Sequence, residues 1–436
     1  MPTPTPPAPV NSSAVTLSRQ RWTRLMPIVF VTYSFAYLER SNFSIAVAGG
    51  MTEDLHITGS VSALLGSLFF LGYFAFQIPG AVYAERRSVK QLIVWCLVLW
   101  GLLATAQGLI TDVRVLMAVR FLLGVSEAAV LPAMVIYITH WFTKQERGRA
   151  NTWLILGNPV TVLWLTVVSG YLVEWIGWQG MFMAQGIPAL VWAVVFHRFI
   201  DDRPRDAGWL SESERKDLED ALDAEQRQLP PSDGYLSALR SRNVILLSLQ
   251  YFLWSVGVYG FVFWLPSIVS AGSHEGIGMT GVISATPYVF ACIAMLVNSR
   301  ASDRAGNRSR FVWPWLLLGA AAFYGSYLLG DAFWLSFPLL CVAAAAMYAP
   351  YGPYFATIPE FLPQSVSGAA IALINSFGAL GAFAGSYLIG TLNDVTGSTA
   401  ASFLTMASCL VAAAALMWAV RTPGIVDGAV AIAGKD

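Results

Sequence analysis

The chain contains twelve long apolar stretches separated by polar segments. They lie at about 24–46, 61–84, 91–110, 114–140, 150–173, 180–199, 243–270, 279–300, 311–330, 333–357, 366–391 and 398–420. All of them reach the roughly 20 residues that a helix needs to cross a bilayer. Only helices and closed barrels satisfy their backbone groups in lipid. The pattern therefore predicts an all-α membrane protein with twelve transmembrane helices, and a charged fraction of only 12% agrees with that class.

A polar segment at 200–242 divides these stretches into six and six. SGYLVEWIGW ends the fifth stretch and GSYLIGTLNDVTG ends the eleventh, so the two halves echo each other. Such echoes predict two pseudo-symmetric halves, 24–199 and 243–421, with a site between them near the midplane. We expect 1–23 to be a disordered tail and 422–436 a second tail. The segment 200–242 is predicted to be a linker with a short helix that Ser211 and Glu214 begin as a capping box.

Basic residues predict the orientation, because cytoplasmic loops carry an excess of lysine and arginine. One set of alternate connections is nearly free of lysine and arginine, with Arg114 as the exception, whereas the opposite set holds Arg86, Arg87, Lys90, Lys144, Arg147, Arg149, Arg300, Arg304, Arg308 and Arg310. Both termini and the linker are therefore expected to be cytoplasmic, in a multi-pass protein of the cell inner (plasma) membrane.

Composition also argues against several kinds of ligand. The formal net charge is zero, which gives no reason to expect nucleic acid as a partner. The four cysteines have spacings that suit neither a disulfide framework nor a metal site. The four histidines fall at predicted helix ends or in loops. We therefore expect no metal and no bound cofactor.

Four charged residues fall inside the predicted spans and away from their ends: Glu39, Arg40, Arg120 and Glu127. A charge at the bilayer centre costs roughly 2.5–3.5 kcal/mol on insertion scales, so such residues usually face a cavity, pair with one another and mark a pathway. Two acids and two bases in the first and fourth spans therefore predict a site for an anion and a proton.

Helix geometry relates these four residues to one another. Arg120 and Glu127 are two turns apart on one face, and Arg40 and Arg120 both fall roughly 10 Å from the outer surface. Glu39 and Arg40 point about 100° apart, so we expect one of them to pair with the fourth span. Arginine suits a carboxylate ligand because its planar fork binds bidentately. Buried salt bridges that only fix helix packing are the alternative interpretation.

Polar and aromatic residues of other spans could complete a binding site. Asn158 and Asn375 occupy corresponding positions in the two halves, and Gln77 lies in the second span. Each could contact a substrate or only join helices. Further aromatic candidates are Tyr251 in the seventh span and Tyr351 and Tyr354 in the tenth. The tenth span, YAPYGPYFA, contains enough proline and glycine to predict a broken helix.

These features resemble the major facilitator superfamily over nearly the full length of the chain. Asp303, Arg304 and Arg308 match the DR-x-G-x-R part of that superfamily's cytoplasmic gate motif. Within the superfamily, the chain is similar to the anion:cation symporter family. The segments that carry this likeness are YLERSNFSIA, RFLLGVSEAAVLPA, WFTKQERGRAN and DDRPRDAGWL.

The resemblance implies a role for each matching residue. It makes Arg40 and Arg120 ligands of the substrate carboxylate and Glu127 a proton-coupling residue. Glu39 stands where the family more often has aspartate, and it is a second proton-coupling candidate. Tyr37 and Tyr73 match cavity-lining tyrosines.

The expected function is proton-coupled symport of an organic carboxylate by alternating access, with the proton as coupling ion. The tenth and eleventh spans favour a sugar acid of the aldonate, uronate or ketogluconate type. An aromatic carboxylate is the alternative substrate, and a non-transporting ligand sensor is an alternative of another class. No nucleophile–base pair lies within the predicted spans, so we do not expect an enzyme. The expected partners are a small organic anion, a proton and the lipid bilayer, bound by a monomer.

Overall fold

A computed structural model describes residues 19–227, 241–305, 308–330, 332–358, 364–398 and 400–420. Within these ranges the chain forms helices and no strand. The elements of the first half are α1 (Gln20–Ala46), η1 (Val47–Met51), α2 (Thr52–Asp54), α3 (Gly59–Arg86), α4 (Val89–Gln107), α5 (Val113–Ala128), α6 (Val130–Trp141) and α7 (Lys144–Phe199). The linker contains η2 (Pro204–Asp206) and α8 (Glu212–Arg227). The second half contains α10 (Arg242–Ser273), α11 (Ile277–Ala305), η3 (Arg308–Phe311), α12 (Trp313–Leu328), α13 (Phe333–Tyr348), α14 (Tyr351–Thr357), α15 (Gln364–Thr396) and α16 (Ala400–Ala419).

The described residues contain ten helical stretches that are long and apolar enough to cross a membrane. One of them, Trp153–Phe199, is two crossings joined at Gly177, whose φ of +73° breaks the helical path. A further helix, α1, has 27 residues, a length that also suffices to cross. With α7 divided and α1 included, the structure has the twelve predicted spans.

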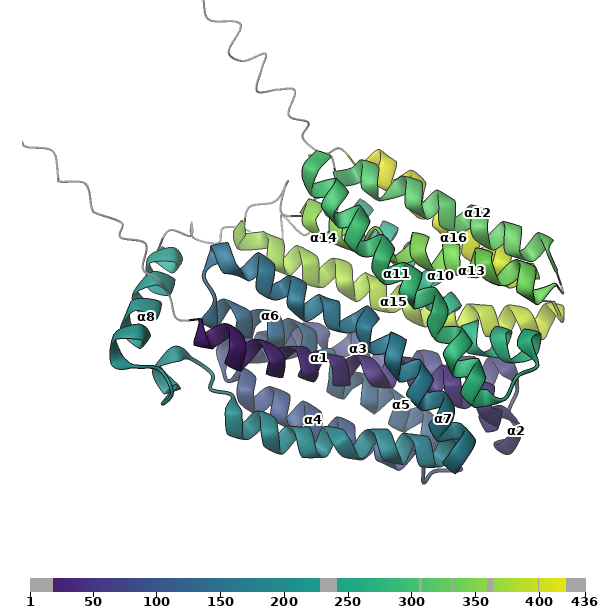
Figure 1. The fold of residues 1–436 in the computed structure, drawn as a ribbon, viewed down its shortest axis with the longest axis horizontal. Coiled ribbons are helices and arrows are strands. Elements are labelled where there is room, and N and C mark those ends of the chain that lie inside the picture. Colours follow the sequence, from purple (N-terminus) through teal and green to yellow (C-terminus); the bar gives the residue numbers. More distant parts are fainter. Residues whose placement is uncertain are drawn as a thin grey trace, which may run out of the picture.

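The two six-helix halves lie side by side, with the helices of 19–199 in the lower layer of Figure 1 and those of 241–420 in the upper layer. The halves meet where α3 packs on α15, α7 on α11 and α1 on α10. We call the end at which α1 begins the terminal end and the opposite end, which carries α2, the distal end. The linker helix α8 lies beyond the terminal end (Figure 1).

At the distal end, an acidic side chain of each half contacts the other half. The backbone N–H of Ser60, in the first turn of α3, donates to the Asp394 Oδ2 of α15 at 2.6 Å. A Cβ on Gly59 would lie only 2.7 Å from Asp394, so the small residue permits this approach. On the other side, Glu174 of α7 contacts Gly278 in the first turn of α11. Asp394 and Glu174 both lie in the segments whose sequences echo each other.

Two spans are broken near their middle. The tenth span is interrupted at Ala349 and Pro350, between α13 and α14, as its proline content predicts. The fourth span is interrupted at Ala129, one turn before Pro132. A proline at 132 cannot donate to the carbonyl of residue 128, which explains the weak point. The break follows Glu127 directly.

The first part of the linker packs against the terminal end of the first half. The predicted capping box is present, since Ser211 N–H donates to Glu214 at 3.2 Å and Glu214 N–H donates to Ser211 Oγ at 3.3 Å. Trp209 stacks on Trp141 with ring centroids 5.5 Å apart, and the Arg24 guanidinium lies 5.1 Å from the Trp209 ring. This part of the linker is therefore attached to the first half.

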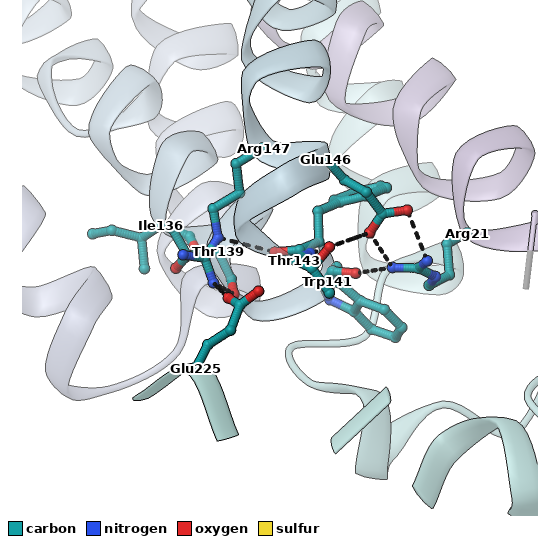
Figure 2. A network of polar contacts seen from close by, with 9 residues as sticks. Arg21, Ile136, Thr139, Trp141, Thr143, Glu146, Arg147 and Glu225 are labelled. Carbon is teal, nitrogen blue, oxygen red and sulfur yellow. Dashed lines mark hydrogen bonds and ion pairs between the residues drawn. The ribbon is translucent and has the colours of Figure 1, made fainter. Parts of the chain in front are cut away.

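A polar network joins the first span, the α6–α7 loop and the linker (Figure 2). Arg21 is buried; it donates to the Trp141 carbonyl at 2.6 Å and pairs with Glu146 at 3.0 Å. Arg147 pairs with Glu225 of α8 at 3.2 Å. The network therefore connects three segments that are distant in sequence.

Replacing Glu146 with glutamine should lower stability by about 1–3 kcal/mol, because the buried Arg21 loses its counter-charge. Burial raises the pKa of Glu146, but the bonds from Arg21, Thr143 and Trp22 lower that pKa by more, so it lies below its usual value. Its stabilising effect is therefore complete above a pH of about 4.3, the pKa of an unfolded glutamate, and declines below it. Thermal unfolding in detergent should show a difference from wild type at neutral pH that shrinks in acid. The exposed Glu275→Gln variant is the control, and an equal loss in both variants would contradict the prediction.

Candidate functional site

An ion pair between the first and fourth spans lies at the centre of the first half. The Arg40 Nε is 3.6 Å from Glu127 Oε2. The Glu127 side chain is 0% exposed and that of Arg40 is 9% exposed. This confirms that one of the two adjacent charges of the first span pairs with the fourth. The Glu39 side chain lies outside the described part of the structure, so its predicted proton role stays a prediction.

Aromatic rings surround the Arg40 guanidinium. Its Cζ lies 4.5 Å from the ring centroid of Tyr73, 5.0 Å from that of Tyr37 and 5.8 Å from that of Phe69. Rings at this distance attract a cation without using its N–H groups. Among the described residues, Arg40 has no hydrogen-bond acceptor, so its donors are available to a ligand.

Arg120 has a different environment, although it touches the same Phe69 ring at 5.4 Å. It is 1% exposed and donates to the carbonyls of Leu65 and Gly66 at 3.3 and 3.4 Å. It also donates to Gln107 Oε1 at 3.3 Å. Arg40 and Arg120 therefore contact the same ring, but only Arg40 offers free donors among the described residues. In this conformation Arg120 joins α5 to α3 and α4.

Residues of both halves meet beside this ion pair. The hydroxyls of Tyr37 and Tyr259 are 3.4 Å apart, and Asn158 lies beside Tyr37. Nearer the terminal end, Ser376 Oγ donates to Gln77 Oε1 at 3.0 Å, which joins α15 to α3. The predicted residues Tyr37, Asn158 and Gln77 are thus brought to the boundary between the halves. Asn375 is adjacent to Ser376 and is half-buried.

The second half contributes a cluster of aromatic rings, which we call the aromatic wall: Tyr251, Trp254, Tyr348, Tyr351, Tyr354 and Phe355. Tyr251 stacks on Tyr354 with centroids 5.4 Å apart, and Trp254 lies 4.5 Å from Tyr351. Tyr354 is fully buried and donates its hydroxyl to the Leu247 carbonyl at 2.8 Å. That hydroxyl is used within the second half, whereas Tyr351 remains partly exposed.

The predicted gate motif lies at the terminal end. Arg304 is an exposed residue in the last turn of α11, and Arg308 begins η3. The Asp303 side chain is outside the described residues. Its gate role therefore stays a prediction.

Phe69 and Phe70 belong to this site but were not predicted to bind substrate. Phe70 lies 4.7 Å from Tyr259 across the two halves. Phe69 precedes Tyr73 by four residues, a spacing that places both rings on one helix face and could have indicated Phe69. The described residues contain no group of three or more metal-binding side chains.

Comparison with known proteins agrees with this architecture. A protein of Agrobacterium vitis named "Putative tartrate transporter" is 31% identical over 401 residues, covering 90% of this chain and 88% of the relative. A "Quinolone resistance transporter" of Acinetobacter baumannii is 31% identical over 392 residues, covering 87% and 88%. The inner membrane transport protein RhmT of Escherichia coli K12 is 29% identical, covering 91% and 94%.

Solved structures share the fold. A bacterial homologue of the lysosomal transporter Spinster, in an inward-facing and occupied conformation, has a TM-score of 0.73 at 16% identity and covers 94% of this chain and 99% of its own. A D-xylose–proton symporter has a TM-score of 0.71 at 14% identity, covering 90% and 97%. The family model of the Major Facilitator Superfamily matches residues 29–386. The chain therefore belongs to the Major Facilitator Superfamily and is a multi-pass membrane transporter rather than an enzyme.

Proposed function

We propose that this transporter is a proton-coupled symporter of an organic carboxylate, of the anion:cation symporter type. The observation that carries the proposal is the state of Arg40, a nearly buried cation with an acidic partner 3.6 Å away and no hydrogen-bond acceptor in the part of the chain that the structure describes. A carboxylate can supply the acceptors that the guanidinium lacks, in the bidentate geometry that arginine favours. The relative from Agrobacterium vitis, named for tartrate, supports an organic acid as substrate.

Glu127 would couple the proton to this binding event. When Glu127 is ionised, the pair with Arg40 is neutral and attracts an anion weakly. When Glu127 is protonated, the pair carries one positive charge in a site of low dielectric, where Coulomb attraction is strong. Substrate and proton would therefore enter together. The terminal end would face the cytoplasm, with the protein in the inner (plasma) membrane as a monomer and with no cofactor besides the proton.

A sugar acid of the aldonate, uronate or ketogluconate type is our first substrate class. An aromatic carboxylate is the second, and the aromatic wall of the second half favours it, because stacked rings bind a planar apolar ligand. Hydroxyls of a sugar acid would instead bind Asn158 and Asn375, at corresponding positions of the two halves.

Uptake by proteoliposomes tests both the proton coupling and the substrate class. Purified protein should accumulate at least one acid from a panel of tartrate, gluconate, 2-ketogluconate, galacturonate, benzoate and hydroxyphenylacetate when an inward proton gradient is imposed. A protonophore should abolish the accumulation, and protein-free liposomes provide the blank. If uptake of every acid in the panel ignores the gradient, the proposed coupling is wrong. The ranking of sugar and aromatic acids decides between the substrate classes.

A further inference from the structure

The break in the tenth span leaves backbone carbonyls without their usual donors. In an unbroken helix, the N–H of residue 353 would donate to the carbonyl of residue 349. Residue 353 is proline and has no N–H, so the Ala349 carbonyl loses that bond. Ala349 is buried, and a buried carbonyl without a partner is costly.

Asn298 of α11 supplies the missing donor. Its Nδ2 donates to the Ala349 carbonyl at 2.8 Å and to the Phe311 carbonyl at 2.9 Å. Its Oδ1 accepts from Trp315 Nε1 at 2.7 Å. The side chain is 3% exposed, and both of its amide hydrogens are used. One buried amide therefore ties the break in the tenth span to η3 and α12.

The aromatic wall depends on the position of this break. Trp254 donates its indole N–H to the Met347 carbonyl at 3.1 Å, just before the break, and its ring lies 4.5 Å from Tyr351, just after it. Tyr348 and Tyr351 stand on either side of Ala349 and Pro350, with ring centroids 5.6 Å apart. A shift of α14 relative to α13 would move Tyr351 relative to Tyr348 and Trp254.

We propose that Asn298 is a positioning residue for transport. Through the Ala349 carbonyl it sets the angle between α13 and α14, and through that angle it places Tyr351 within the aromatic wall. The effect on substrate rests on the proposed function, but the effect on the angle does not.

A double-mutant cycle distinguishes two roles of Asn298. In one it positions α14, and in the other it only supplies a hydrogen-bond donor to the Ala349 carbonyl. Asn298→Ala should lower the thermal midpoint in detergent and raise the KM for transport by about fivefold or more. Pro353→Ala restores an N–H that can reach the Ala349 carbonyl, so the double variant Asn298→Ala/Pro353→Ala should regain the part of the thermal stability that this one bond supplies, while the Phe311 carbonyl and the Trp315 N–H still lack Asn298. Its KM should remain raised, because the carbonyl is then held within its own helix. Recovery of both quantities would assign Asn298 a purely structural role, and an unchanged KM in Asn298→Ala would overturn the proposal.

A second measurement needs no substrate. Ala356→Cys places a thiol on α14, where its rate of reaction with a maleimide reports the position of that helix. Adding Asn298→Ala should change this rate by about threefold or more, while Trp315→Phe, which keeps both Nδ2 bonds of Asn298, should change it little. An unchanged rate in the Asn298→Ala background would contradict control of α14 even if the substrate class were wrong. If the maleimide rate changes but the protein shows no gradient-driven uptake, the positioning role of Asn298 stands and the proposed transport function is wrong.

Discussion

Replacing Glu127 with glutamine should abolish proton-driven accumulation of substrate but preserve counterflow, in which labelled and unlabelled substrate exchange without net proton movement. Glutamine fills nearly the same volume but carries no titratable proton. Because Arg40 then keeps an uncompensated positive charge, the variant still binds an anion. We expect gradient-driven uptake in proteoliposomes to fall by about 100-fold, the scale of removing an essential proton-transfer group, and exchange to stay within about threefold of wild type.

The role of Glu127 also predicts how the substrate affinity changes with pH. In the wild type, affinity should fall as pH rises, because ionised Glu127 competes with the substrate for Arg40. In Glu127→Gln, affinity should be nearly constant over a range of about pH 5 to 8. Glu275→Gln makes the same chemical change at an exposed position and should behave like the wild type. A poorly folded Glu127→Gln protein whose remaining molecules still accumulate substrate would indicate that Glu127 serves only packing.

The architecture follows from patterns that are local in sequence. The apolar stretches predicted the spans because a bilayer fixes helix length. Pro350 and Pro353 predicted the interruption of the tenth span because each lacks an N–H. The interruption at Ala129 has a similar cause in Pro132, which the apolar pattern of the fourth span conceals. The turn between the fifth and sixth spans lies at Gly177, whose φ of +73° breaks the helical path, and the sequence alone does not show which residue there adopts that conformation.

The residues of the site could be predicted from the sequence, but the different roles of its two arginines could not. The free-energy cost of a charge within the bilayer identified the charged residues. Helix geometry then predicted that Arg40 and Arg120 lie at a similar depth. An arginine has free donors only where the residues around it supply no hydrogen-bond acceptors. Two of the acceptors of Arg120 are the carbonyls of Leu65 and Gly66, which any residue type at 65 and 66 would provide. Backbone acceptors leave no mark in the sequence, so the enclosure of Arg120 could only be seen in three dimensions.

The two arginines should respond in opposite ways to the same substitution. Arg40→Lys keeps the charge but loses the planar fork, so the KM for the carboxylate should rise by about tenfold or more while the thermal midpoint changes little. Arg120→Lys cannot donate in the same way to Leu65, Gly66 and Gln107. It should lower stability by about 1–3 kcal/mol for each buried acceptor left without a donor. The KM of the molecules that remain folded should stay near the wild-type value.

Measured side by side, the two variants control for each other, because each changes an arginine that contacts the Phe69 ring. Thermal unfolding without substrate gives the stability term, and initial uptake rates at saturating and limiting substrate separate Vmax from KM. If Arg120→Lys raises KM while its midpoint stays unchanged, Arg120 must reach the substrate in another conformation of the transport cycle. In that case the carboxylate would be bound by both arginines, and the enclosed position of Arg120 would belong to the state seen in this structure. If instead Arg40→Lys transports with an unchanged KM, the open donors of Arg40 do not bind the carboxylate and the proposed substrate site is wrong.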